Sequence, residues 1–251
     1  MSIVNIINEG VVRIIELNRP DKRNALNDEL IAALKDAMRE ADSDESLRAI
    51  VISGAGKDFC SGADLAAIQK IAGATYEENV EDARSLAELF ELIRKVRVPV
   101  IAAVHGRALA GGCGLAFACD LVIAARSARF GFPEVKIGFV PAMVAAILRR
   151  NLGEKRSFEL LTLGAEFSAE EAAAFGLVNH LSPDEDFDTA AIEYATRYAR
   201  VSGSAVAMTK RLLYDIDADD ISTAVAKGVE TNARARMTDD CKNGIAEFLE
   251  K

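Results

Sequence analysis

The first half of the chain alternates short apolar runs with longer segments of helical periodicity. Four runs have the length of strands: 11–17, 48–53, 98–104 and 120–125. The third is rich in β-branched residues, as is typical of a strand buried on both faces. The segments 27–41 and 80–95 lie between these runs and repeat apolar residues at helical spacing. This alternation predicts an α/β core with a mostly parallel sheet, because parallel strands need crossover connections.

The second half becomes mostly helical after Pro141. Ser168 and Glu171 form the pattern of a capping box, which predicts a short helix at that point. Further helices are predicted at 204–214, 221–233 and from 239 to the end. We therefore expect an α/β core at residues 1–195 and a C-terminal helical region at residues 196–251.

Two glycine-rich turns, at 59–65 and 106–114, each join a predicted strand to a predicted helix. Backbone N–H groups at the start of a helix have no partner inside it. Two such turns side by side at one sheet edge would direct two N–H groups at one oxygen, as in an oxyanion hole. Each turn taken alone favours a simpler interpretation, in which small residues let strand and helix pack closely. Nucleotide binding is disfavoured, because the second turn lacks G-x-G-x-x-G and no Lys-Ser/Thr pair follows either turn.

Charge and composition narrow the choice of partners. The formal net charge of −9 disfavours nucleic acid and anionic membranes, which both need a basic surface. Four cysteines without a C-x-x-C pair, together with only two histidines, make a metal centre unexpected. Because the sequence has no long apolar stretch and no signal-like start, we expect a cytoplasmic protein without a membrane partner.

Four segments in order carry a resemblance to a known family: 18–26, 59–65, 99–120 and 130–141. They read Asn-Arg-Pro-Asp-Lys-Arg-Asn-Ala-Leu, Phe-Cys-Ser-Gly-Ala-Asp-Leu, a run from Pro99 to Asp120, and one that includes Phe-Gly-Phe-Pro-Glu. Together they resemble the crotonase, or enoyl-CoA hydratase/isomerase, superfamily. The resemblance implies a spiral of ββα units and a C-terminal helical region that makes homotrimers, often paired into hexamers. It also implies an acyl-CoA thioester as substrate, with coenzyme A as part of that substrate and no separate cofactor.

The resemblance assigns roles to residues by their place in these motifs. The N–H groups of Ala63 and Gly111 match the family's oxyanion hole, and Glu134 matches its catalytic acid/base. The positions that match contacts to CoA are Lys22, Arg23, Ala25, Ala63, Asp64, Leu65, Phe248 and Lys251. The positions that match the acyl pocket are Gly114, Phe139, Ala142 and Met143.

One departure from the family pattern bears on the reaction. Typical hydratases carry two glutamates, and the first of them falls on Gly114, where Met143 or Phe139 is expected to fill the space. A single carboxylate suits a 1,3-proton shift from C2 to C4 of an enoyl-CoA, and burial among phenylalanines is expected to raise its pKa. Hydration stays open, with the N–H of Ala142 helping to place water.

Other reactions and a non-enzymatic role also remain open. Decarboxylation and thioester hydrolysis occur in this family, and the missing glutamate allows a catalytically idle CoA-binding homologue. Asp64 could cap its helix, and His105 is expected to be structural. Arg84 could meet a substrate carboxylate, although a solvated helix residue is the favoured interpretation. The cysteines at 113 and 119 are expected to be buried small apolar residues.

Overall fold

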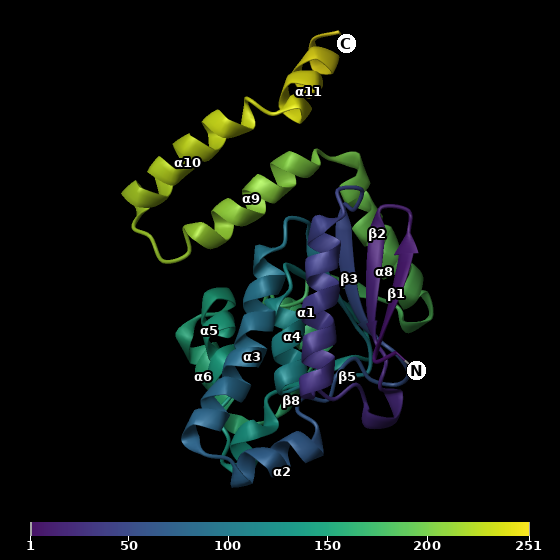
Figure 1. Ribbon diagram of the computed structural model, residues 1–251, viewed down its shortest axis with the longest axis vertical. Coiled ribbons are helices and arrows are strands. Elements are labelled where there is room, and N and C mark those ends of the chain that lie inside the picture. Colours follow the sequence, from purple (N-terminus) through teal and green to yellow (C-terminus); the bar gives the residue numbers. More distant parts are fainter. Residues whose placement is uncertain (1, 251) are drawn as a thin grey trace.

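The computed structural model describes residues 2–250, apart from the side chain of Leu65, and shows a six-stranded sheet flanked by helices (Figure 1). The strand order is β1-β2-β3-β4-β6-β9. The bounds are β1 Val4–Glu9, β2 Val12–Leu17, β3 Ala49–Gly54, β4 Val100–Val104, β6 Leu121–Ala125 and β9 His180–Ser182. Within this sheet β1 is antiparallel to β2, and the other neighbouring pairs are parallel. The predicted α/β core is therefore confirmed.

Burial explains which strands the sequence predicts. All five residues of β4 are buried, so the strand appears in the sequence as a continuous apolar run. The edge strand β1 is not predicted, because its last four residues are exposed and Ile6 and Ile7 interrupt any alternation. It forms because all six of its residues pair with β2, from Val4 opposite Leu17 to Glu9 opposite Val12.

Helices cover both faces of this sheet (Figure 1). α1 (Asp28–Ser43) and α3 (Tyr76–Lys95) pack together on one side, and α8 (Phe187–Thr196) packs on the other. Asn27 caps α1, because its side chain accepts the N–H of Leu30 at 2.9 Å. α2 (Leu65–Gly73) runs through Gly73, and a capping box of Thr75 and Glu78 starts α3 two residues later.

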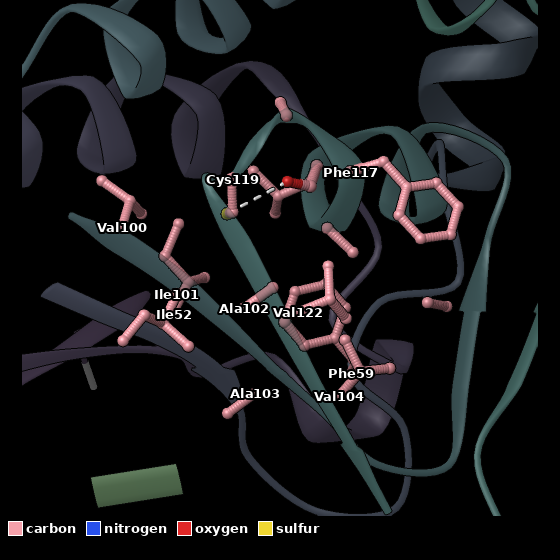
Figure 2. Packing of buried hydrophobic residues seen from close by; sticks show 14 of the residues in the cluster. Ile52, Phe59, Val100, Ile101, Ala102, Ala103, Val104, Phe117, Cys119 and Val122 are labelled. Carbon is pink, nitrogen blue, oxygen red and sulfur yellow. Dashed lines mark hydrogen bonds between the residues drawn. The ribbon is translucent and has the colours of Figure 1, made fainter. Parts of the chain in front are cut away.

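A second, smaller sheet lies beside the first. Its strands, in order, are β5 (Arg107–Leu109), β7 (Arg129–Gly131) and β8 (Glu166–Ser168). Between the sheets runs α4 (Gly111–Ala118), which is buried from Gly112 onward. Figure 2 shows Phe117 and Cys119, at the end of α4, packed with Phe59 and the side chains of β4 and β6. The core therefore extends to the ends of both glycine-rich turns.

The remaining helices include the three predicted at the C-terminal end. Their bounds are α5 Ala142–Asn151, α6 Glu154–Leu163, α7 Ala169–Ala174, α9 Gly203–Asp215, α10 Ile221–Ala235 and α11 Asp239–Leu249. α9 is anchored to the core by Lys210, whose Nζ lies 2.7 Å from Asp120 Oδ2 and donates to the carbonyls of Ile93 and Val98. α10 and α11 extend away from the sheets and bury none of their residues (Figure 1). No helix within residues 2–250 has the length and apolar character needed to cross a membrane.

Candidate active site

The two glycine-rich turns lie against each other. Cys60 donates its N–H to Arg107 O at 3.1 Å and accepts the N–H of Leu109 at 2.9 Å. A Cβ atom at Gly62 would lie 2.8 Å from Ala110 Cβ and 3.5 Å from Gly111 N. The structure therefore brings the first turn into contact with the start of α4, and residue 62 has no room for a side chain.

Hydrogen bonds fix the direction of the N–H groups of Ala63 and Gly111. In a trans peptide the N–H points opposite to the C=O of the same unit. Gly62 O accepts the N–H of Leu26 at 2.7 Å, so the N–H of Ala63 points away from Leu26. Ala110 O accepts the N–H of Gly114 at 2.9 Å, so the N–H of Gly111 points out of the start of α4. Neither group has an acceptor among residues 2–250.

Glu134 lies in a short 3-10 helix, η2 (Pro133–Ile137), next to the second turn. Three residues before it, Gly131 O accepts the N–H of Ala110 at 2.9 Å, which ties this segment to the turn. The Glu134 carboxylate is half-buried, and its Oε2 atom is buried without a hydrogen-bond partner in the described part of the chain. Burial raises the pKa of Glu134 above the usual carboxyl value. A raised pKa makes the Glu134 carboxylate a stronger base than an exposed glutamate.

Two unpaired N–H groups and one carboxyl of raised pKa are the parts that a thioester enolate requires. A family model described as enoyl-CoA hydratase/isomerase matches residues 7–251. The chain belongs to the enoyl-CoA hydratase/isomerase family.

Relatives and solved structures agree with this family and with the expected fold. A Thermus thermophilus protein that bears an enoyl-CoA hydratase name is 39% identical over 98% of this chain and 97% of its own length. The crotonyl-CoA hydratase of Syntrophomonas wolfei is 34% identical over 100% of this chain and 97% of its own. The crystal structure of an enoyl-CoA hydratase from Mycobacterium smegmatis superposes with a TM-score of 0.95 at 34% identity, covering 100% of this chain and 97% of that one. The crotonase-like fold is therefore confirmed, and the chain is an enzyme of the hydratase/isomerase family.

Gly114 is closed off, but not by the residues expected from the sequence. A Cβ atom there would lie 2.6 Å from Val144 Cγ2 and 3.0 Å from Phe90 Cζ. Phe139, proposed to fill this space, is 48% exposed. The correction has a tertiary cause, because α5 turns Val144 rather than its neighbour Met143 toward α4. A carboxylate at the position where family hydratases carry their first glutamate has no room here.

We predict that Gly114→Glu destabilises this family member by about 2–3 kcal/mol, since it overpacks a filled site and buries a charge. It should bring no gain in hydration of a short 2-enoyl-CoA. Urea unfolding measures the first effect and a hydration assay the second. Adding Val144→Ala, with Val144→Ala alone as control, should recover part of the lost stability. A single variant that is as stable as the parent and hydrates faster would show that the position is open.

Ala142 and Met143 differ in how they fit the acyl-pocket assignment. The N–H of Ala142 donates to Val140 O at 2.7 Å, so it is not free to place a water molecule as expected. Met143 is partly buried and lines a cavity of about 390 Å³ between α3, α5 and the end of α9. A larger cavity of about 770 Å³ lies between the start of α1, α2 and α3, and contains neither turn nor Glu134.

The expected CoA contacts fall into exposed, buried and undescribed positions. Lys22 and Arg23 are exposed on the turn before α1, whereas Ala25 is buried. Phe248 is 78% exposed on α11, which lies at the opposite end of the molecule from α2 (Figure 1). Lys251 and the side chain of Leu65 lie outside the described residues. Within one chain, the exposed bases near the first turn are thus separated from Phe248.

Asp64 is engaged within the chain. Its Oδ1 accepts the N–H of Ala66 at 2.9 Å, which confirms it as the cap of α2. Its Oδ2 accepts a hydrogen bond from Arg19 Nη2 at 2.6 Å. The helix N–H and the guanidinium together hold the pKa of Asp64 below its usual value, with the helix N–H the larger cause. A direct role of Asp64 toward CoA therefore has to compete with these two partners.

The residues that the sequence marked as weaker candidates have structural roles. Arg84 is exposed and pairs with Glu81 at 2.7 Å, one helical turn away. His105 lies within hydrogen-bonding distance of Gly56 O, with its Nε2 at 2.9 Å. The cysteines at 60, 113 and 119 are buried free thiols. Within residues 2–250 no group of three or more His, Cys, Asp and Glu side chains could hold a metal ion.

Two polar residues that shape the first turn were not predicted from the sequence. Asn24 is fully buried in a left-handed backbone conformation (φ 54°), and its side chain accepts from Arg19 N and donates to the carbonyls of Ala55 and Asp58. Asp58 is buried as well and accepts the N–H of Arg107 at 3.0 Å. An asparagine beside a predicted turn was the available signal for a left-handed residue.

Proposed function

We propose that the enzyme shifts the double bond of an enoyl-CoA from C3 to C2, using Glu134 as its single acid/base. The observation that carries this proposal is the contrast between two positions. Glu134 has a buried, unpartnered carboxylate oxygen, whereas a carboxylate at Gly114 is excluded by Val144 and Phe90. One carboxyl group is sufficient for a proton shift, because the proton it removes is the proton it returns.

The proposed steps balance without any group beyond the substrate and this chain. Glu134 takes a proton from C2 of the 3-enoyl thioester, and the electron pair of that C–H bond forms a dienolate. The negative charge gathers on the thioester oxygen, where the N–H groups of Ala63 and Gly111 stabilise it. The dienolate then takes the proton back from Glu134 at C4, which leaves the double bond between C2 and C3. The raised pKa of Glu134 makes its carboxylate a stronger base and so assists the first step, the removal of the C2 proton.

Hydration is the second candidate, favoured by the relatives' names. Those names include the crotonyl-CoA hydratase of Syntrophomonas wolfei and the short-chain-enoyl-CoA hydratase of Clostridium acetobutylicum. In this chain the water would have to be oriented by Glu134 without a second carboxylate at Gly114. The N–H of Ala142 is already bonded to Val140 O, which removes the helper expected from the sequence. These two features favour the proton shift.

The test is incubation of the enzyme with matched 3-enoyl-CoA and 2-enoyl-CoA thioesters, followed by mass spectrometry and NMR of the products. A shift of the double bond at unchanged mass is the expected result. A faster gain of one water by the 2-enoyl thioester would replace the proposal with hydration. Loss of carbon dioxide from a carboxylated thioester or release of free CoA would indicate the other family reactions. No conversion of any thioester that binds would indicate a catalytically idle homologue.

We propose that Lys22 and Arg23 bind the phosphates of CoA. Both side chains are exposed beside the first turn, and the backbone of Arg23 accepts the N–H of Ser61 at 3.0 Å, which ties this basic pair to the oxyanion turn. Arg23 Nε lies 3.9 Å from Asp58 Oδ2, so its guanidinium has only a loose partner of its own. A phosphate group can therefore recruit both cations without breaking a close ion pair.

We also propose that the chain forms trimers through its C-terminal helices. Ile221, Val225 and Val229 repeat every four residues on α10 and are all more than half exposed, which leaves an apolar stripe without a cover in one chain. Such stripes on helices are typical of association surfaces. A homotrimer, alone or paired into a hexamer, is what the family resemblance implies.

Charged substitutions in the apolar stripe on α10 test the proposed assembly. Val225→Glu together with Val229→Glu should convert the assembly to monomers, because each places a charge where an apolar contact is expected. Light scattering after size exclusion measures the mass. Glu230→Gln, an exposed position on the same helix, serves as the control and should leave the mass unchanged. A parent protein that is already monomeric at micromolar concentration would contradict the proposal.

A further inference from the structure

The N–H of Ala63 owes its direction to two hydrogen bonds on either side of it. Leu26 donates its N–H to Gly62 O at 2.7 Å and accepts the N–H of Asp64 at 2.8 Å. Ala63 therefore lies between two peptide units that are both held by Leu26. Any relaxation of the contact between Leu26 and this turn would rotate the Gly62–Ala63 peptide and its N–H with it.

Arg19 spans this contact from the side. Its Nη1 donates to the carbonyl of Ala25, the residue before Leu26, and its Nη2 donates to Asp64 Oδ2 at 2.6 Å, the residue after Ala63. The side chains of Arg19 and Asp64 are 16% and 12% exposed, so water competes only weakly for this pair. The Arg19 guanidinium thus joins the segment of Leu26 to the first turn, and the contact between these two segments sets the direction of the N–H of Ala63.

Both ends of this bridge are themselves fixed. The N–H of Arg19 donates to the buried side chain of Asn24 at 2.9 Å, and the carbonyl of Arg19 accepts the N–H groups of Lys22 and Asn24. The second oxygen of Asp64 caps α2 at Ala66. The bridge therefore connects a locked turn on one side to the start of a helix on the other.

We infer that Arg19 and Asp64 act as a clamp that positions the N–H of Ala63 toward the thioester oxygen. They are positioning residues, since both are occupied by partners inside the chain. The inference rests on the proposed function of Ala63 as an oxyanion donor. A backbone donor has no side-chain rotamer that could adjust, so the direction of its N–H depends on the contacts around it. A displacement of about 1 Å can cost roughly 100-fold in rate.

The test compares Arg19→Met, Arg19→Lys and Asp64→Asn with the exposed control Arg39→Met, whose parent side chain pairs with Asp36 on the same helix, α1. Arg19→Met should lower kcat about 10- to 100-fold with little change in KM, because binding through CoA is kept while the transition-state contact is lost. Arg19→Lys should be intermediate, since an ammonium keeps the charge but cannot bridge both acceptors in the same way. Asp64→Asn keeps the cap of α2 and serves as the second variant should Arg19→Met not fold.

A spectroscopic readout separates this inference from the proposed function. A 2-enoyl-CoA labelled with ¹³C at the thioester carbonyl is bound to the Glu134→Gln variant, which blocks turnover, and its carbonyl stretch is measured by difference infrared spectroscopy. The band should lie at lower frequency than in free ligand and should return toward the free value when Arg19→Met is added. An unchanged band and unchanged kcat in Arg19→Met would overturn the clamp. A band that is not shifted even with Arg19 intact would overturn the oxyanion hole itself, and the clamp with it.

Discussion

Turnover by Glu134→Gln is expected to fall by about 10²–10⁴ while binding of the CoA thioester stays near the parent value. Glutamine keeps the size of the side chain and its place in η2 but cannot accept a proton from C2. Steady-state assays with a 3-enoyl-CoA measure the rate, and calorimetric titration with a CoA thioester measures binding. The binding measurement is also the control, because a misfolded variant would lose both. Near-parent turnover would remove Glu134 from the mechanism.

The raised pKa of Glu134 gives this variant a pH signature. The carboxylate must be ionised to take the proton, so kcat/KM of the parent should fall as the pH is lowered through a pKa above the usual carboxyl range. The folded protein binds this proton more tightly than the unfolded chain does. Ionisation of Glu134 therefore lowers the free energy of unfolding at pH values above its folded pKa. Below its unfolded pKa, near 4.5, this loss of stability is absent. Glu134→Gln should thus be more stable than the parent at neutral pH, with the gap closing toward acid pH.

Gly111→Pro is expected to lower kcat by about 10²–10³, because proline removes one of the two N–H groups proposed to bind the thioester oxygen. The position suits this test, since Gly111 is the first residue of α4 and its N–H has no partner within residues 2–250. Proline is tolerated at the first position of a helix for that reason. Initial rates and the free energy of unfolding are both measured, because the preceding Ala110 has an unusual conformation that proline restricts.

Gly111→Ala is the matched control for the proline variant. Alanine keeps the N–H and adds only a methyl group, which would lie 3.3 Å from Leu26 Cδ1, the end of a flexible side chain. Its rate should therefore stay within a few-fold of the parent. If the folded proline variant turned over as fast as the alanine variant, the oxyanion donor would have to be a different group.

Most of the large sheet could be predicted because its central strands are buried on both faces and appear as continuous apolar runs. β1 could not, since it is held by pairing with β2 rather than by a buried face. The short strand β5 lies inside the glycine-rich segment 106–114, whose sequence indicates a turn, and β7 has only three residues. Three residues carry too little pattern to indicate a strand, so the second sheet had to come from the tertiary structure.

At the candidate site, the sequence predicts which functional groups are present better than it predicts which residues surround them. The two turns follow from local composition and Glu134 from the family resemblance, and the structure brings the turns into contact. The neighbours of Gly114 depend on the rotation of α5 against α4, which no local pattern specifies, so Val144 and Phe90 were not predicted. Arg19 was missed as well, because its partner Asp64 is 45 residues away in sequence.

Both proposed donors to the thioester oxygen are backbone groups, and this has an evolutionary consequence. An N–H is present whatever side chain follows, so mutation can rarely delete it and selection has little residue identity to preserve at Ala63. What must be inherited is room for the peptides to approach, as at Gly112, where a Cβ atom would lie 2.3 Å from Cys60 O. The positions that the family resemblance assigns to the acyl pocket, such as Met143 and Phe139, carry no such restriction. New substrates can therefore arise by substitutions there while the means of activating the thioester passes unchanged to descendants.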